Sequence, residues 1–174
     1  ADAGMVGCLG NHEIYAKAQD YVAPAAARLG VRFLRGESLE LKFKGKTISI
    51  AGVDYQRKNT PYLVGAENLV RPAAAVNVLL SHNPDVFPVA VEKGFDFVAS
   101  GHTHGGQVRL EYLHQYVNPA RFFTPFVSGK YEIGDARLYV SRGVGTVAVP
   151  TRIMARPEIS LLTLRTTTSK ETPS

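Results

Sequence analysis

Four of the five histidines of this 174-residue chain lie in short polar turns that follow apolar segments. His12 is part of a Gly-Asn-His-Glu sequence with Asn11, His82 follows Ser81, and His102 and His104 share a Gly-His-Thr-His-Gly-Gly turn. Neutral imidazole is a common ligand of transition metals, and an Asn amide oxygen can join it. Loops that follow strands carry function more often than the strands do. The residue types and their positions therefore predict a metal site that performs chemistry.

The segments that position these histidines read as strands joined by a helix. An apolar run over 76–80 precedes His82, and another over 95–99 precedes His102. Between them, Pro84-Asp85 opens a helical stretch that Gly94 ends. Strand, helix and strand in succession favour parallel pairing with a right-handed crossover, which places the following turns at one edge of the sheet. We therefore expect an α/β fold with a site at the carboxyl edge of its sheet.

The remaining chain supplies further elements. We expect one helix, two strands that alternate around Lys44-Gly45-Lys46 as a hairpin, and two closing strands. Their expected ranges are 15–29 for the helix, 31–34 for a strand, 39–43 and 47–50 for the hairpin, and 138–140 and 159–164 for the closing strands.

Three motifs follow one another in this chain, namely Gly-Asn-His-Glu at 10–13, the histidine after the apolar run 76–80, and Gly-His-Thr-His at 101–104. In this order they resemble the motifs of the calcineurin-like metallophosphoesterase superfamily. The wording Leu-Leu-Ser-His-Asn-Pro-Asp at 79–85 and Ser-Gly-His-Thr-His-Gly-Gly at 100–106 is most similar to its YkuE-like branch. The resemblance implies an α/β fold, a partial αββα sandwich with mixed sheets flanked by helices. It also implies a hydrolase of phosphodiesters or pyrophosphates that uses a hydroxide bridging two divalent ions of manganese, iron or zinc.

The resemblance assigns the metal ligands by position. Asn11, His82 and His102 would ligate one ion, and His104 would reach the other. The family supplies its bridging carboxylate from two earlier motifs, Asp-x-His and Gly-Asp-x-x-Asp, which do not occur here. We therefore expect residues 1–165 to be the C-terminal portion of one domain, with its N-terminal half as a missing partner. This chain alone would hold at most one ion, weakly, and would be inactive.

The resemblance also suggests catalytic residues. His12 would stand over the leaving-group oxygen, with metal ligation as its alternative, and Glu13 would orient it. Arg142 could approach a substrate phosphate or could hold turn carbonyls. Asp54 is either a turn-capping residue or a substitute metal ligand. A non-catalytic scaffold with the same fold is the alternative to the enzyme.

Composition sets weaker limits. Hydrophobic residues make up 45% and charged residues 20%, which suits a globular domain. The residues behind the formal charge of +5 are dispersed along the chain, so nothing indicates a nucleic-acid partner.

Cys8 is the single cysteine and reads as a buried structural thiol. The aromatic stretch over 112–131 suggests packing under a long loop or contact with the acyl group of a lipid-linked substrate. The resemblance to the YkuE-like branch implies a phospholipid-like or sugar-nucleotide substrate near a membrane. We expect His114 at the surface and residues 166–174 to be a disordered tail. The compartment is left open by this sequence.

Overall fold

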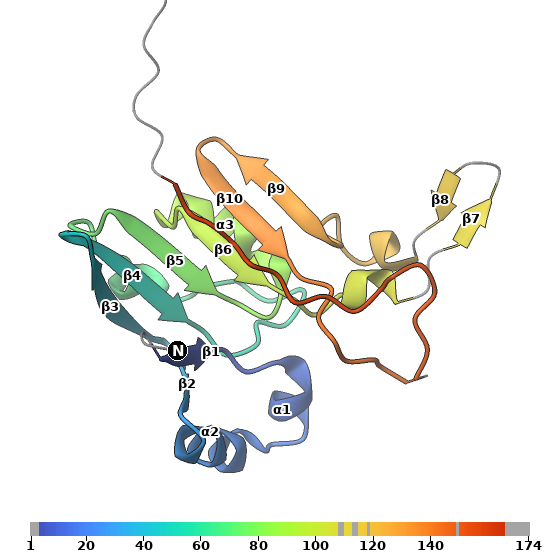
Figure 1. Cartoon of the computed structure of the whole chain (residues 1–174), viewed down its shortest axis with the longest axis horizontal. Helices are drawn as coiled ribbons and strands as arrows, with labels where there is room; N and C mark the ends of the chain where they lie inside the picture. Colours follow the sequence, from blue (N-terminus) through green and yellow to red (C-terminus); the bar gives the residue numbers. More distant parts are fainter. Residues whose placement is uncertain (1–3, 108–109, 113–114, 118, 149, 166–174) are drawn as a thin grey trace, which may run out of the picture.

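The computed structural model describes residues 4–107, 110–112, 115–117, 119–148 and 150–165. Its centre is a six-stranded sheet with the strand order β3-β4-β5-β6-β10-β9 (Figure 1). The strands of this sheet are β3 (Glu37–Phe43), β4 (Lys46–Gly52), β5 (Val76–Leu80), β6 (Phe97–Ser100), β9 (Gly129–Ile133) and β10 (Ala136–Val140).

The four central strands of the sheet, β4, β5, β6 and β10, are parallel, and the outer strands β3 and β9 pair antiparallel to their neighbours. The predicted hairpin is confirmed, because β3 and β4 are joined by Lys44 and Gly45, both at positive φ. The predicted strands before His82 and His102 are also confirmed as β5 and β6. Because β5 and β6 are adjacent and parallel, the turns that follow them meet at one edge of the sheet.

One face of this sheet carries the hydrophobic core. Strand β10 shows the alternation, with Ala136, Leu138 and Val140 buried. The core packs against η1 (Ala66–Leu69), η2 (Pro84–Val86) and α3 (Phe87–Glu92), the last two forming the predicted helix between β5 and β6. The predicted α/β class, with mixed strands and flanking helices, is thus confirmed.

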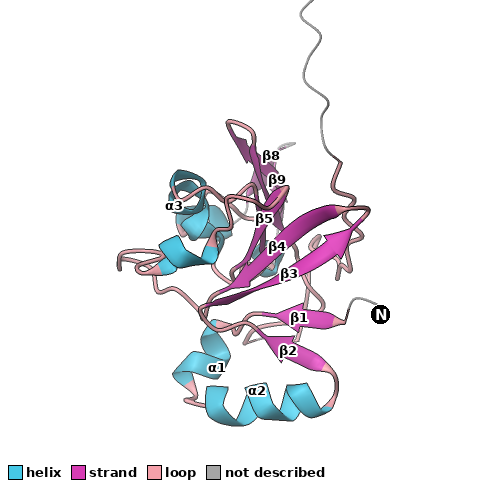
Figure 2. Cartoon of the chain, turned by 90° about the vertical axis from the view of Figure 1, so that its left-hand side faces the viewer, coloured by secondary structure: helices cyan, strands magenta, loops and turns pink. Residues whose placement is uncertain are grey.

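The N-terminal residues form a separate small layer. Strand β1 (Met5–Gly7) pairs in parallel with β2 (Val31–Phe33), and α2 (Gln19–Arg28) packs beside them, below β3 in Figure 2. The predicted single helix over 15–29 is wrong at its start. Helix α1 (Asn11–Tyr15) precedes α2, and Lys17 at φ 52° separates them. The sequence pattern did not predict α1, because this helix begins at Asn11, inside the Gly-Asn-His-Glu motif.

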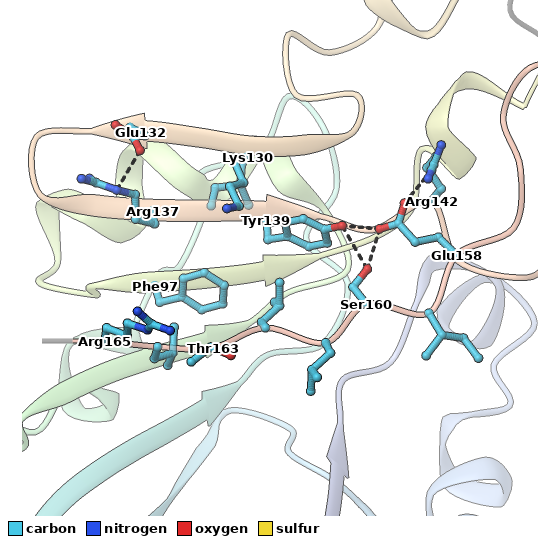
Figure 3. A pocket seen from close by; sticks show the side chains of 15 residues that line it. Phe97, Lys130, Glu132, Arg137, Tyr139, Arg142, Glu158, Ser160, Thr163 and Arg165 are labelled. Carbon is cyan, nitrogen blue, oxygen red and sulfur yellow. Dashed lines mark hydrogen bonds and ion pairs between the residues drawn. The ribbon is translucent and has the colours of Figure 1, made fainter.

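The predicted closing strand over 159–164 is also wrong. This segment runs beside β10 without a strand ladder, held through Glu158 and Ser160, which both hydrogen-bond the Tyr139 hydroxyl (Figure 3). Ile159 and Leu161 remain 93% and 95% exposed. An alternating apolar pattern specifies a strand only when a neighbouring strand supplies hydrogen bonds, and within the described ranges no strand pairs with these residues.

The aromatic stretch divides in two. Phe126 packs edge-on against Phe87 and Tyr131, at ring-centroid distances of 5.9 and 5.1 Å, which confirms the packing interpretation for this part. Phe122 and Phe123 are instead 82% and 70% exposed. The stretch also contains β7 (Leu110–Tyr112), β8 (Gln115–Val117) and η4 (Pro119–Phe122).

Two of the expectations fall outside the described residues, namely those for His114 and for the tail 166–174. None of the helices in the described part of the chain is both long enough and apolar enough to cross a membrane.

Candidate metal centre

Asn11 and His82 meet across the two sheets. The loop after β1 brings Asn11 to the first position of α1, and the turn after β5 carries His82. The two side chains are in contact, with 3.0 Å between Asn11 Oδ1 and His82 Nε2. Gly10 permits this approach, because a Cβ there would lie 3.1 Å from Cε1 of the His82 ring. The glycine of the Gly-Asn-His-Glu motif is therefore explained by the space that His82 needs.

His102 completes a group of three donors. Its ring centroid lies 4.8 Å from that of His82, as expected from adjacent parallel strands ending at one edge. The backbone reaches this position through left-handed conformations at two non-glycine residues, His102 at φ 71° and His104 at φ 51°. Such conformations cost on the order of 1–3 kcal/mol each and concentrate at functional sites. Of the three glycines in this turn, Gly105 and Gly106 also have a positive φ, whereas Gly101 does not.

His104 lies in the same turn as His102, and its ring contacts the loop that follows β10. Its Nδ1 lies 3.0 Å from the carbonyl oxygen of Gly145, which leaves Nε2 as the nitrogen available to a ligand. Arg152 fixes the same loop by donating to the carbonyls of Gly145, Arg142 and Ala155. In the described ranges, no three His, Cys, Asp or Glu side chains gather closely enough to hold an ion by themselves.

The environment keeps the two central imidazoles neutral. Burial, followed by the charges of the neighbouring histidines, lowers the pKa of His82 from 6.5 to about 4. Burial also lowers the pKa of His102, with the charge of His104 as the second cause. A neutral imidazole has a lone pair to offer a metal, whereas imidazolium has none.

The donor set of Asn11, His82 and His102 fits part of the shell of one transition-metal ion. An amide oxygen and two neutral imidazoles are suitable ligands for manganese, iron or zinc. In the metal-free hydrogen bond the Nε2 of His82 carries the proton that Asn11 Oδ1 accepts. Ligation through Nε2 requires the other tautomer of His82, with the proton on Nδ1.

Tyr55 belongs to this centre, although none of the sequence motifs contains it. It follows β4, the neighbour of β5, and its ring centroid lies 6.0 Å from His82 and 5.3 Å from His102. Tyr15 packs edge-on against it at 5.8 Å. Burial, followed by the interaction with Tyr15, raises the pKa of Tyr55 to about 12, so this phenol stays protonated. The feature that could have identified Tyr55 is its position shortly after β4, the strand that pairs with β5.

Three other expected site residues have structural partners. Glu13 accepts a hydrogen bond from the Gly10 amide at 2.9 Å and so caps α1, and within the described chain no hydrogen bond joins it to His12. Arg142 pairs with Glu158 at 2.5 Å and packs its aliphatic carbons against Gly105. The alternative in which Asp54 is a metal ligand does not hold, because Arg35 occupies its carboxylate at 3.0 Å.

His12 is exposed at the second position of α1, next to Asn11. The structure thus brings together Asn11, His82 and His102, with His12 beside Asn11 on α1 and the His104 ring against the loop after β10.

Comparison with known proteins gives this arrangement its context. The chain is 34% identical over 174 residues to an uncharacterized metallophosphoesterase of Aquifex aeolicus, covering 93% of the chain and 61% of that protein. It is 32% identical over 123 residues to the uncharacterized metallophosphoesterase YkuE of Bacillus subtilis, covering 71% and 42%. It is 26% identical over 162 residues to the phosphodiesterase YaeI of Escherichia coli, covering 90% and 57%. The chain belongs to the metallophosphoesterase superfamily.

Within that superfamily, the relatives confirm the similarity to the YkuE-like branch. The chain spans about half of the length of the curated relatives it matches. No family model matches the sequence. Metallophosphoesterases as a class act with divalent metal ions, and the neutral donor group of this chain suits such an ion in part.

Proposed function

We propose that this chain forms the histidine-rich half of a metal-dependent phosphoester hydrolase. The observation that carries the proposal is the convergence of Asn11, His82 and His102 from three separate segments, with 3.0 Å between the first two and ring centroids 4.8 Å apart for the two histidines. A fold without a ligand to bind gains nothing from bringing neutral imidazoles together at some cost in backbone conformation. The similarity to metallophosphoesterases supports the same class of chemistry.

In this proposal Asn11, His82 and His102 hold one ion, and Nε2 of His104 reaches a second. Divalent ions bound there would supply a nucleophilic hydroxide at neutral pH and offset charge on the phosphoryl oxygens. Because all of these donors are neutral, the protein side chains do not cancel the charge of the ions. The centre therefore favours an anionic substrate, such as a phosphodiester.

His12 is proposed as the group that handles the leaving-group proton. It is exposed beside Asn11, so a substrate at the centre can reach it without displacing a packed side chain. An imidazole is suited to deliver a proton near neutral pH. Arg142 is a substrate contact only if its pairing with Glu158 leaves donors directed at the phosphate.

Further polypeptide, of the kind that the longer relatives possess, is proposed to complete the centre. Carboxylate ligands are needed to hold two ions close together, and in the described part of the chain no group of three or more His, Cys, Asp or Glu side chains could hold an ion. The structure also leaves surface for such a partner, with Ile159 and Leu161 exposed beside a cavity of about 770 Å³ along β10, whose lining is both polar and apolar (Figure 3). This partner corresponds to the missing N-terminal half that the sequence led us to expect.

The test compares this chain with a longer one that includes the residues encoded before it. Metal content after dialysis and turnover of bis(p-nitrophenyl) phosphate with added manganese are measured for both. We expect the longer chain to bind about two ions and to be active, and His82→Ala and His102→Ala to lower kcat/KM by at least about a hundredfold. Phe43→Ala, a 61% exposed residue of β3, is the control.

Two results would count against the hydrolase. Metal binding without turnover of any phosphoester would favour the scaffold with the same fold. Full activity in His82→Ala and His102→Ala would show that the chemistry takes place elsewhere.

A further inference from the structure

A cavity of about 310 Å³ opens beside His102, where four loops meet. Its walls come from the loop after β4, the start of η2, the turn after β6 and the end of η4. The residues that matter here are Tyr55, Lys58, Asp85, His102, Phe123 and Thr124. Because His102 lines the cavity and also contacts His82, the cavity is adjacent to the proposed metal centre.

Two aromatic side chains line this cavity. Tyr55 lies on the side of His102, at a ring-centroid distance of 5.3 Å, and Phe123 contributes to the lining from the residue after η4. Phe122 and Phe123 are consecutive and are 82% and 70% exposed. Neighbouring exposed phenylalanines beside a cavity are typical of ligand sites, because water contact with such rings is unfavourable until a ligand covers them.

Two charged groups line the cavity, and both are engaged by protein partners. The Lys58 ammonium donates to the carbonyl oxygen of Phe123, which ties η4 to the loop after β4. The Asp85 carboxylate accepts from the Thr124 hydroxyl and adds negative charge to the wall. An anion placed beside Asp85 would be repelled, whereas an uncharged apolar group would not.

We infer that this cavity binds the apolar group, an aryl ring or a short alkyl or acyl chain, of a phosphoester whose phosphate lies at His82 and His102. The inference rests on the proposed function and narrows its substrate class to phosphoesters with an apolar substituent, as opposed to pyrophosphates. The volume is at the low end for small-molecule sites, so it suits one ring or a chain of about six carbons.

The first test uses alkylphosphonates of increasing length, from methyl to octyl, as competitive inhibitors of the active longer protein. A fully buried methylene improves binding about fourfold, and a half-buried one about twofold. From methyl to hexyl we therefore expect Ki to fall by roughly thirtyfold and then to level off. Phe123→Ala should flatten this dependence and leave the Ki of methylphosphonate unchanged, whereas Phe43→Ala, an exposed phenylalanine of β3, should change neither.

A second test addresses the charge of the wall. Adding a terminal carboxylate to the hexyl chain should weaken binding by roughly tenfold, and Asp85→Asn should recover most of that loss. The role of Asp85 is overturned if hexylphosphonate and its carboxylate derivative bind equally well. It is also overturned if the carboxylate weakens binding to Asp85→Asn as much as it weakens binding to the wild type.

A third measurement separates this inference from the hydrolase proposal. Hexanol carries no phosphate, so its binding in EDTA, followed through amide chemical shifts, reports on the cavity alone. Shifts centred on Thr103 and Phe123 without any turnover would support the cavity while the hydrolase fails. Turnover with a Ki that is independent of chain length would overturn the cavity assignment while the hydrolase stands.

Discussion

Acid should destabilise this protein through His82, and the effect can be isolated by His82→Gln. Burial, followed by the charges of the neighbouring histidines, lowers the pKa of His82 from 6.5 to about 4. Between these two values the unfolded chain binds a proton at this residue and the folded chain does not. A lowered histidine pKa therefore contributes stability above pH 6.5 that is lost as the pH falls toward 4.

The magnitude follows from the same two values. At pH 5 nearly all of the unfolded chain carries the proton, whereas about a tenth of the folded chain does. Integrating the difference from pH 7.5 to pH 5 gives a loss of roughly 2 kcal/mol in the free energy of unfolding. His102 acts in the same direction, because burial also lowers its pKa.

Urea unfolding in EDTA at pH 7.5 and at pH 5 measures this loss. We expect His82→Gln to reduce the difference between the two pH values by roughly 2 kcal/mol relative to the wild type. His12→Gln, which removes an exposed histidine of the same region, controls for the loss of a histidine as such. Parallel pH dependence in wild type and His82→Gln would refute the claim that this imidazole is held neutral by its surroundings.

Three further predictions concern the supports of the site. Gly52→Ala should lower the unfolding free energy by roughly 1–3 kcal/mol in urea titrations, because its Cβ would lie 2.5 Å from the Leu34 Cβ, whereas Gly101→Ala meets no atom within 4 Å and should cost far less. Burial, followed by the charge of Asp54, raises the pKa of Cys8 to about 12, so Cys8 should resist iodoacetamide at pH 8 until the protein is unfolded. The same shift should lower the free energy of unfolding as the pH rises above 9. Rapid labelling of Cys8 in the native protein would contradict this prediction. Arg152→Ala should lower the melting temperature and disturb the His104 ring signals in NMR spectra, because it frees the carbonyls of Gly145 and Ala155, while the exposed Arg28→Ala of α2 should do neither.

Several elements could be predicted because their patterns are local. The apolar runs before His82 and His102 are buried strands, and the residues between them form the helical crossover, so the order of elements alone places both histidines at one sheet edge. The hairpin around Lys44 and Gly45 is equally local, since its turn needs two residues at positive φ.

Other features depend on partners distant in sequence. Residues 159–164 have a strand-like pattern, but they form no ladder because the pattern does not supply the neighbouring strand. Asp54 could be a ligand or a cap until Arg35, from a different segment, is seen to occupy it. Glu13, which the motif suggested as a residue that orients His12, accepts a hydrogen bond from the Gly10 amide and caps α1.

The sequence by itself determined which donors exist and at which strand ends they lie, because strands and turns are specified by patterns of a few residues. Only the tertiary structure decided that Asn11 and His82 touch, that Tyr55 joins them and that the His104 ring contacts the loop after β10, which Arg152 holds. The physical reason is that such contacts depend on how strands pair and how closely side chains can pack, as the fit of the His82 ring over Gly10 illustrates.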